Sequence, residues 1–430
     1  MAVNVNQVGY ERRLAVVKDI LKSRGLQVSK ISDVAYDEAY TYAFNNFFFK
    51  VELATPASSS IFTGKQHGTT AAPSDGVSVL VLKLSNPTAG GVNNTNRVEN
   101  DVAVQHLVRQ SMAEAGVEAL VPVVYAWTPT TDAKAEEGFG WIMSELKHGV
   151  DLNTVFPSLP LEDKVPILEQ FATVLKTIQT ARIPDSAKMY GGLTFDSSGM
   201  IVSGQSSVYK SDPVATYAEF RLSKLRKQLE LAAQSPVIQG WKSNGIAGRI
   251  EKFIASGGPE KLLAGADLGR MSIIHGDLTT HNMLFDTGTK RITAVLDFDF
   301  SFISHTLDEF ISGSSLGDLG GMVDFNNKPL KDAILSGNFS TFPENLDKES
   351  TQRWQGAKAW NAAMKTVGVV SPSDMRGVQK ICDLIELQIL ICPFDLGNQL
   401  MIDQMDDGKK AARREKTEAD LVQWLDEHGF

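Results

Sequence analysis

The residue types best suited to chemistry gather in two stretches, IIHGDLTTHNMLFD at residues 273–286 and ITAVLDFDF at residues 292–300. In the first, an apolar pair precedes Asp277, and Asn282 follows five residues later. In the second, an apolar run leads to Asp297. We expect both apolar runs to be strands that end side by side and bring the three polar side chains together. Carboxylate and amide oxygens are the ligands that Mg²⁺ prefers, so the sequence predicts a magnesium site here.

The spacing of these residues also indicates a reaction. An Asp, an Asn five residues later and an Asp after the next strand form the H-R-D-x-x-x-x-N and metal-binding Asp arrangement of protein kinases. Asp277 is the candidate catalytic base, because its carboxylate can orient a substrate hydroxyl and take its proton. Asn282 and Asp297 are the candidate Mg²⁺ ligands. The pattern therefore predicts phosphoryl transfer.

Structural interpretations of the same residues stay open. Asp277 and Asn282 also suit a turn between strands. For His275 the structural interpretation is favoured, as a buried imidazole that holds the loop by hydrogen bonds. Asp299 fits either a second metal contact or a carboxylate that fixes the loop.

A lysine in the first part of the chain is a candidate phosphate ligand. Lys83 lies within VSVLVLKLS at residues 77–85, where a buried cation needs an anionic partner. Phosphates and a carboxylate on the following helix would serve, and Glu99 and Asp101 are the candidates for that carboxylate. Taken alone, an exposed strand lysine would be the better interpretation. Together with the Asp–Asn–Asp pattern, we predict the phosphate-binding role.

The elements that must position these residues change in character near residue 147. Before it, apolar spacing predicts helices and strand-like runs in the order helix 8–24, strand 45–53, strand 77–85, helix 96–115, strand 121–129 and strand 139–146. The long Ser-, Thr-, Gly- and Pro-rich segment between the first two strands is predicted to be a mobile insertion.

The remainder is predicted to be mainly helical, except for a hairpin at 191–204 and the strands around the candidate site. A glycine-rich segment at 313–350 is predicted to be loop. The charged C-terminal segment is predicted to be a helix that docks through Leu421, Trp424 and Leu425. We therefore predict an α+β, bilobal, protein-kinase-like fold. Its N-lobe (residues 1–147) is an antiparallel sheet plus helix, and its larger C-lobe (148–430) holds the catalytic loop, the metal site and the substrate pocket.

Composition excludes several classes of protein. The 430-residue chain has a formal net charge of -9 and a pI near 5.4, which disfavours nucleic-acid binding because that needs a basic face. No run approaches the ~18 apolar residues of a transmembrane helix, and the N-terminus lacks the apolar core of a signal peptide. Two cysteines are too few for a disulfide scaffold. We expect a soluble cytoplasmic enzyme of unknown oligomeric state, with no membrane partner.

The chain resembles the aminoglycoside phosphotransferase and choline kinase-like family, in particular its fungal branch of small-molecule kinases. The resemblance extends from about residue 40 to 310 and rests on NNFFFKVEL, VLVLKLSNP, NRVENDVAVQHLVRQSM, GWIMSELKHGVDL, GGLTFDSSG, IIHGDLTTHNMLFD and AVLDFDFSFISH. It implies ATP as the cosubstrate, Asp277 as the catalytic aspartate, and Asn282 and Asp297 as the magnesium ligands. It also implies that Lys83 contacts the α- and β-phosphates.

Further nucleotide contacts are implied by the same resemblance. Asp101 matches the acidic partner of the lysine, one methylene shorter than the usual Glu, with Glu99 as the alternative. The adenine would lie against Met143 and bind the backbone of Ser144 and Leu146. The turn around Asn45 would take the place of a phosphate-covering loop.

We therefore expect an ATP- and Mg²⁺-dependent small-molecule kinase that phosphorylates a hydroxyl group. The absence of G-x-G-x-x-G, D-F-G and A-P-E motifs disfavours a protein kinase acting on polypeptides. The alternative is a kinase-like protein that binds a nucleotide or metabolite without phosphoryl transfer. The acceptor stays open among aminoglycosides, sugars, choline, amino alcohols and natural-product alcohols, and Asp318 and Asp324 permit an aminoglycoside only weakly.

Overall fold

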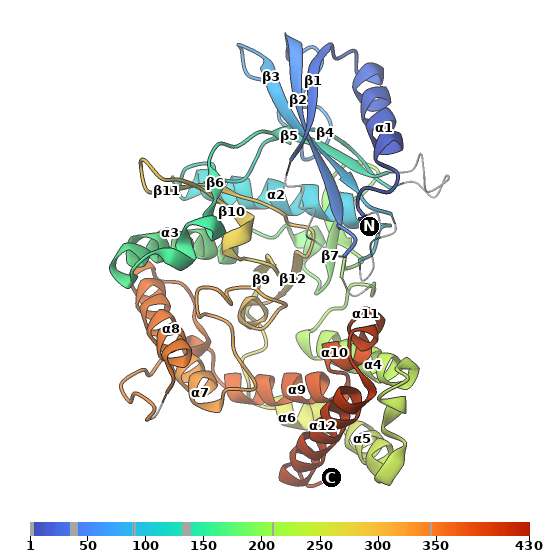
Figure 1. Ribbon diagram of the computed structural model, residues 1–430, viewed down its shortest axis with the longest axis vertical. Helices are drawn as coiled ribbons and strands as arrows, with labels where there is room; N and C mark the ends of the chain where they lie inside the picture. Colours follow the sequence, from blue (N-terminus) through green and yellow to red (C-terminus); the bar gives the residue numbers. More distant parts are fainter. Residues whose placement is uncertain are drawn as a thin grey trace. The chain divides into compact units, whose positions relative to one another are not determined.

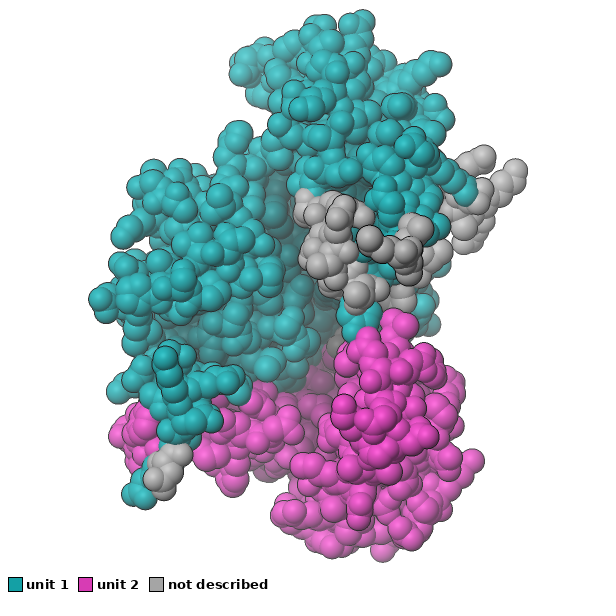
Figure 2. Space-filling view, in the orientation of Figure 1, with its two compact units in different colours: residues 1–213, 271–322, 344–370 teal, residues 214–270, 323–343, 371–430 magenta. Residues whose placement is uncertain are grey.

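The computed structural model in Figure 1 describes residues 4–34, 42–87, 89, 92–130, 139–208, 210–344 and 346–430. The chain divides into two compact units, coloured separately in Figure 2. Unit 1 comprises residues 1–213, 271–322 and 344–370, and unit 2 comprises residues 214–270, 323–343 and 371–430. All the sequence-predicted site residues belong to unit 1. The lobe boundary expected at 147–148 falls within unit 1, and the two-lobe division stays a prediction.

Unit 1 begins with a five-stranded antiparallel sheet in the order β1-β2-β3-β5-β4 (Figure 1). Its elements are α1 (Tyr10–Ser23), β1 (Val28–Val34), β2 (Asn46–Ala57), β3 (Val77–Ser85), α2 (Arg97–Glu114), β4 (Val124–Thr128) and β5 (Trp141–Glu145). Apart from β1, which was not predicted, these elements match the predicted strands and helices. Alternation along β2 buries Phe49, Val51 and Leu53, which share a core with Val17 and Leu21 of α1.

The segment between β2 and β3 is packed against the sheet, so the prediction of a mobile insertion was wrong. Phe62 is 1% exposed, and its ring stacks on Tyr125 of β4 with 5.1 Å between centroids. The indole N–H of Trp127, also in β4, donates to the backbone oxygen of His67 at 2.8 Å. A polar composition alone did not reveal that Phe62 is buried and that this segment contacts β4. These contacts offset the entropy cost of ordering the segment.

The rest of unit 1 surrounds the candidate site with short strands and two long helices. They are β6 (Val150–Asp151), α3 (Leu161–Gln179), β7 (Gly192–Phe195), β8 (Ile201–Gly204), β9 (Met271–Ile274), β10 (Met283–Asp286), β11 (Arg291–Val295), β12 (Phe302–His305) and α8 (Lys348–Val367). The predicted hairpin is β7–β8. The strands that lead to Asp277 and Asp297 do not pair, because β9 pairs with β12 and β11 pairs with β10. Their ends nevertheless lie close together, as predicted, because His275, the residue after β9, is hydrogen-bonded at 3.1 Å to the backbone oxygen of Leu296, the residue after β11.

All the regular elements among the described residues of unit 2 are helices, joined by turns and loops. Its helices are α4 (Tyr217–Gln234), α5 (Ile246–Ala255), α6 (Gly258–Leu263), α7 (Lys328–Ser336), α9 (Val378–Ile391), α10 (Phe394–Gly397), α11 (Gln399–Asp403) and α12 (Asp407–Glu427). The predicted C-terminal helix is α12, which buries Leu421, Trp424 and Leu425. The segment at 313–350 is not all loop, since it contains α7 and the start of α8.

An N-terminal antiparallel sheet followed by mainly helical structure confirms the α+β class. Across the described ranges, the chain has no helix with the length and apolar character needed to span a bilayer.

Candidate active site

Lys83 is the centre of a buried group of charges in unit 1. Its side chain is 8% exposed, and its Nζ lies 2.8 Å from Asp101 in α2. The same ammonium lies 2.7 Å from Asp299 and 3.3 Å from Asp297 in the loop after β11. The structure therefore pairs Lys83 with Asp101, and not with the alternative, Glu99.

The charge of Lys83 is fixed by these partners. Burial by itself lowers the pKa of Lys83, but the carboxylates of Asp101, Asp299 and Asp297 outweigh it, so the pKa is raised well above its usual value. Lys83 is therefore held in its positively charged form by its three carboxylate partners.

Arg97, which the sequence analysis did not single out, is a second buried cation of this group. It is the first residue of α2 and is fully buried. Its Nε and Nη2 donate to Oδ2 of Asp299 at 3.2 and 3.0 Å. Its Nη2 also donates to Oδ1 of Asn46 at 2.6 Å and to the backbone oxygen of Asn45. A signal was present, since Arg97 and Asp101 are four residues apart and so face the same side of α2.

These contacts settle the geometry of Asp299. Its Oδ1 accepts from Lys83, and its Oδ2 accepts from Arg97 and from Nδ2 of Asn46 at 2.6 Å. Burial raises the pKa of Asp299, but the positive charges of Arg97 and Lys83 lower it by more than burial raises it. The pKa of Asp299 therefore lies well below its usual value. Both carboxylate oxygens are used by protein donors. The structure thus favours the loop-fixing interpretation of Asp299 over a metal contact.

The loop that carries Asp277 is held by a buried histidine. His275 is fully buried, and its Nδ1 accepts from the backbone N–H of Asp277 at 3.3 Å. Its Nε2 therefore carries the proton and donates to the backbone oxygen of Leu296 at 3.1 Å. This confirms the structural interpretation of His275 and ties the loop to the segment just before Asp297.

Glu309, which the sequence did not indicate, also holds the loop of Asp277. Its carboxylate accepts from the backbone N–H groups of His275 at 2.6 Å and Gly276 at 3.2 Å, and from the hydroxyl of Ser315. Burial raises the pKa of Glu309, and the hydrogen bonds only partly offset this. Gly276 has a φ of 80°, and a Cβ there would lie 2.5 Å from the carbonyl oxygen of Phe300. Only glycine fits this close approach.

Asp277 and Asn282 are in direct contact. Nδ2 of Asn282 donates to the backbone oxygen of Asp277 at 2.8 Å and to its Oδ2 at 2.9 Å. Oδ1 of Asp277 accepts the hydroxyl of Ser314 at 2.8 Å. The backbone N–H of Leu296 donates to the backbone oxygen of Asn282 at 2.9 Å, which places Asp297 beside this pair. The structure thus brings the three predicted residues into one neighbourhood.

The oxygen atoms of Asp297 and Asn282 suit Mg²⁺ as ligands. Asp297 has a φ of 59° and a side chain that is 28% exposed. The pKa of Asp297 is raised above its usual value, chiefly by burial. Lys83 lowers this pKa, but the neighbouring carboxylates of Asp299, Asp101 and Asp277 raise it. A cation beside Asp297 would relieve that repulsion, and the amide oxygen of Asn282 is a second hard donor. Among the described residues, no group of three or more His, Cys, Asp or Glu forms a metal cluster. A magnesium held here would therefore keep several water or phosphate ligands, as Mg²⁺ usually does.

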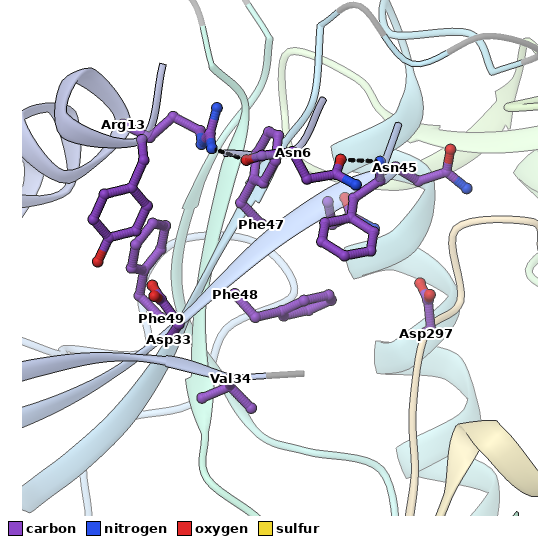
Figure 3. Close-up of a pocket in the computed structure, with 12 residues that line it drawn as sticks. Asn6, Arg13, Asp33, Val34, Asn45, Phe47, Phe48, Phe49 and Asp297 are labelled. Carbon is purple, nitrogen blue, oxygen red and sulfur yellow. Dashed lines mark hydrogen bonds between the residues drawn. The ribbon is translucent and has the colours of Figure 1, made fainter. Parts of the chain in front are cut away.

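A cavity of about 180 Å³ lies beside the turn that precedes β2 (Figure 3). Asn45 and Asp297 both line it. The side chain of Asn6 fixes the turn, since it donates to the backbone oxygen of Tyr42 and accepts from the backbone N–H of Phe44, both at 2.7 Å. The turn predicted to cover phosphates therefore shares a cavity with the predicted metal ligand.

The predicted adenine contacts lie in and just after β5. Met143 is fully buried in the core of the sheet, and Ser144 is aligned with Val81 of β3 and Val124 of β4. Leu146 is the first residue beyond the strand. Their roles toward adenine stay a prediction.

The two acidic residues considered for an aminoglycoside are both engaged locally. Asp318 accepts from the backbone N–H of Thr280 at 2.7 Å and from its hydroxyl, so it braces the loop of Asp277. Asp324 accepts from the backbone N–H of Asn326 in a turn.

A model of the phosphotransferase enzyme family matches residues 74–318, more than half of the chain. The matched range includes Lys83, Arg97, Asp277, Asp297 and Ser314, and it excludes Asn45. No curated relative was found by sequence comparison.

Comparison with solved structures finds similar chains, three of which are the following. The streptomycin–ATP–APH(2'')-IIa ternary complex is 11% identical over 95% of each chain, with a TM-score of 0.45. An aminoglycoside phosphotransferase from Alicyclobacillus acidocaldarius is 12% identical over 94% of this chain and 93% of that one, with a TM-score of 0.36. Plasmodium vivax ethanolamine kinase is 9% identical over 91% and 82%, with a TM-score of 0.35.

Proposed function

Since this chain belongs to the phosphotransferase enzyme family, we propose that it transfers the γ-phosphoryl group of ATP to a hydroxyl group of a small molecule. The observation that carries the proposal is the convergence of a base and a phosphate-binding cation in unit 1. Asp277 contacts Asn282 at 2.9 Å, and Lys83 contacts Asp101 at 2.8 Å and Asp297 at 3.3 Å. Family membership supplies the reaction class, and these side chains supply its parts.

In this mechanism Asp277, Lys83 and Asn282 have distinct tasks. Asp277 orients the acceptor hydroxyl and takes its proton as the oxygen attacks the γ-phosphorus. Lys83 binds the α- and β-phosphates as a fixed charge that needs no reorganisation, which is the electrostatic contribution such transfers require. Asn282 holds Asp277 in position through its amide, so that the base is aligned before the acceptor binds.

Asn282 and Asp297 are the residues that would hold Mg²⁺, which when bound neutralises charge on the β- and γ-phosphates. Asn45 and its neighbours would cover the phosphates. Met143 would lie against the adenine, with the backbone of Ser144 and Leu146 as its hydrogen-bonding partners.

The test is Asp277→Asn, measured by ADP formation with Mg²⁺ and a panel of amino sugars, sugars and amino alcohols. We expect transfer to fall by roughly 10²–10⁴-fold, because the amide can orient a hydroxyl but cannot take its proton. Calorimetry should show Mg·ATP affinity within about threefold of wild type. Asp286→Asn is the matched control, because Asp286 ends β10 away from Asp277 and accepts backbone N–H groups that Asn can also satisfy.

The base, the transfer reaction and the metal site can each be contradicted by a different result. Undiminished acceptor-dependent ADP formation by Asp277→Asn would remove Asp277 as the base. Mg·ATP binding without turnover on any acceptor would favour the non-transferring nucleotide-binding alternative. ATP affinity that is unchanged by chelation of Mg²⁺, or by Asp297→Asn, would remove the metal site.

A further inference from the structure

One carboxylate oxygen of Asp277, the candidate base, already accepts a hydrogen bond from a hydroxyl group of the chain itself. Oδ2 of Asp277 accepts from Asn282, and Oδ1 accepts the hydroxyl of Ser314 at 2.8 Å. This separation is typical of an O–H donor to a carboxylate and lies within the reach that a general base needs. Ser314 thus stands, relative to the base, where an acceptor hydroxyl would stand.

The loop that carries Ser314 is fixed in this place by its own contacts. The backbone N–H of Leu316 donates to the backbone oxygen of Leu278 at 2.9 Å. The backbone N–H of Leu278 donates to the hydroxyl of Ser315, also at 2.9 Å. Gly313 has a φ of 54°, and a Cβ there would lie 3.3 Å from the backbone oxygen of Gly276. The two bonds just after Ser314, and the close approach of Gly313 to Gly276 just before it, hold the Ser314 hydroxyl against Asp277.

Ser314 is also exposed to solvent, in contrast to its neighbour Ser315, which is fully buried. A buried serine in the same loop would have no room for a phosphoryl group, whereas Ser314 has open space on one side. Geometry and exposure together distinguish Ser314 from the other serines of this loop.

We infer that Ser314 is a site of self-phosphorylation, an activity that rests on the proposed function and uses the same base. In this reaction the hydroxyl oxygen of Ser314 forms a bond to the γ-phosphorus of ATP. The bond from that phosphorus to the β–γ bridging oxygen breaks, and ADP leaves with the electron pair. Asp277 takes the hydroxyl proton and releases it to solvent. The reaction is intramolecular, because Ser314 and Asp277 are in contact within one chain.

The experiment incubates the full-length protein with Mg²⁺ and γ-labelled ATP and no added acceptor. We expect up to one phosphate per chain, located on Ser314 by tandem mass spectrometry, with a first-order rate that does not depend on protein concentration. Ser314→Ala should lower incorporation at least about tenfold. Asp277→Asn should lower it by roughly 10²–10⁴-fold. Ser312→Ala, a change two residues away in the same loop, should leave it unchanged.

Several outcomes overturn the inference and leave the proposed function standing. One is a wild-type protein that binds Mg·ATP or forms ADP but carries no phosphate on Ser314, in which case that hydroxyl only occupies the base until an acceptor displaces it. Others are label that persists in Ser314→Ala or in Asp277→Asn, and a rate that rises with protein concentration. A protein that neither binds Mg·ATP nor forms ADP would instead overturn the proposed function, and this inference with it.

Discussion

The two halves of the candidate site are held together by different forces. Around Lys83 there is an ionic cluster of buried opposite charges, made of Lys83, Arg97, Asp101, Asp297 and Asp299. Around Asp277 there is a loop network built mainly from backbone groups, amides and hydroxyls, made of His275, Asp277, Asn282, Glu309, Ser314 and Ser315.

The difference has a physical consequence. A buried charge that loses its partner keeps its full desolvation cost, whereas a neutral group that loses one hydrogen bond costs much less. The ionic cluster should therefore be sensitive to the loss of any one of its charges. In the loop network, the Ser314 hydroxyl on Asp277 can be replaced by another hydroxyl at lower cost.

The largest effect should follow from breaking the ionic cluster. Arg97→Met should lower the free energy of unfolding by about 3–5 kcal/mol, because Asp299 then keeps only Lys83 and Asn46 as donors. Urea unfolding followed by fluorescence measures this change. Lys188→Met is the control, since Lys188 pairs with Asp185 at the surface and its loss should not be measurable. Equal losses of unfolding free energy in the two variants would contradict the idea that the buried ionic cluster contributes more to stability than a surface ion pair.

A smaller effect should follow from breaking the loop network. Ser315→Ala removes the acceptor of the Leu278 N–H and one donor to Glu309, both buried. We expect a loss of about 1–3 kcal/mol in unfolding free energy. We also expect a fall in kcat with little change in the KM for ATP, because only the loop of Asp277 is disturbed. Steady-state kinetics against Ser312→Ala checks this, and a selective rise in the ATP KM would show that the network also serves the nucleotide.

The smallest effect should be the coupling between the two regions. If they act independently, the unfolding free energies lost in Arg97→Met and Ser315→Ala should add in the double variant to within about 0.5 kcal/mol. Urea unfolding of the four proteins gives this coupling directly. A coupling well above 1 kcal/mol would mean that the ionic cluster and the loop network are one structure, linked through the segment that carries Asp297 and Asp299.

Local pattern was enough to predict most elements and to select residues that the structure brings together. The apolar runs located β2, β3 and β9, and the spacing of Asp277, Asn282 and Asp297 indicated the chemistry. These features depend on neighbours within a few residues, whose periodicity is written in the sequence. The packing of the segment after β2 was missed because it depends on Tyr125, far along the chain from Phe62.

The sequence by itself singled out Lys83, Asp277, Asn282 and Asp297 as candidates for the chemistry. Only the tertiary structure decided which partners hold them: Arg97 is 202 residues from Asp299, and Ser314 is 37 residues from Asp277. The path of the chain sets such pairings, and no local periodicity records them. For that reason the candidate residues could be identified from short motifs, whereas the charge balance around Lys83 and the hydroxyl on Asp277 became visible only in three dimensions.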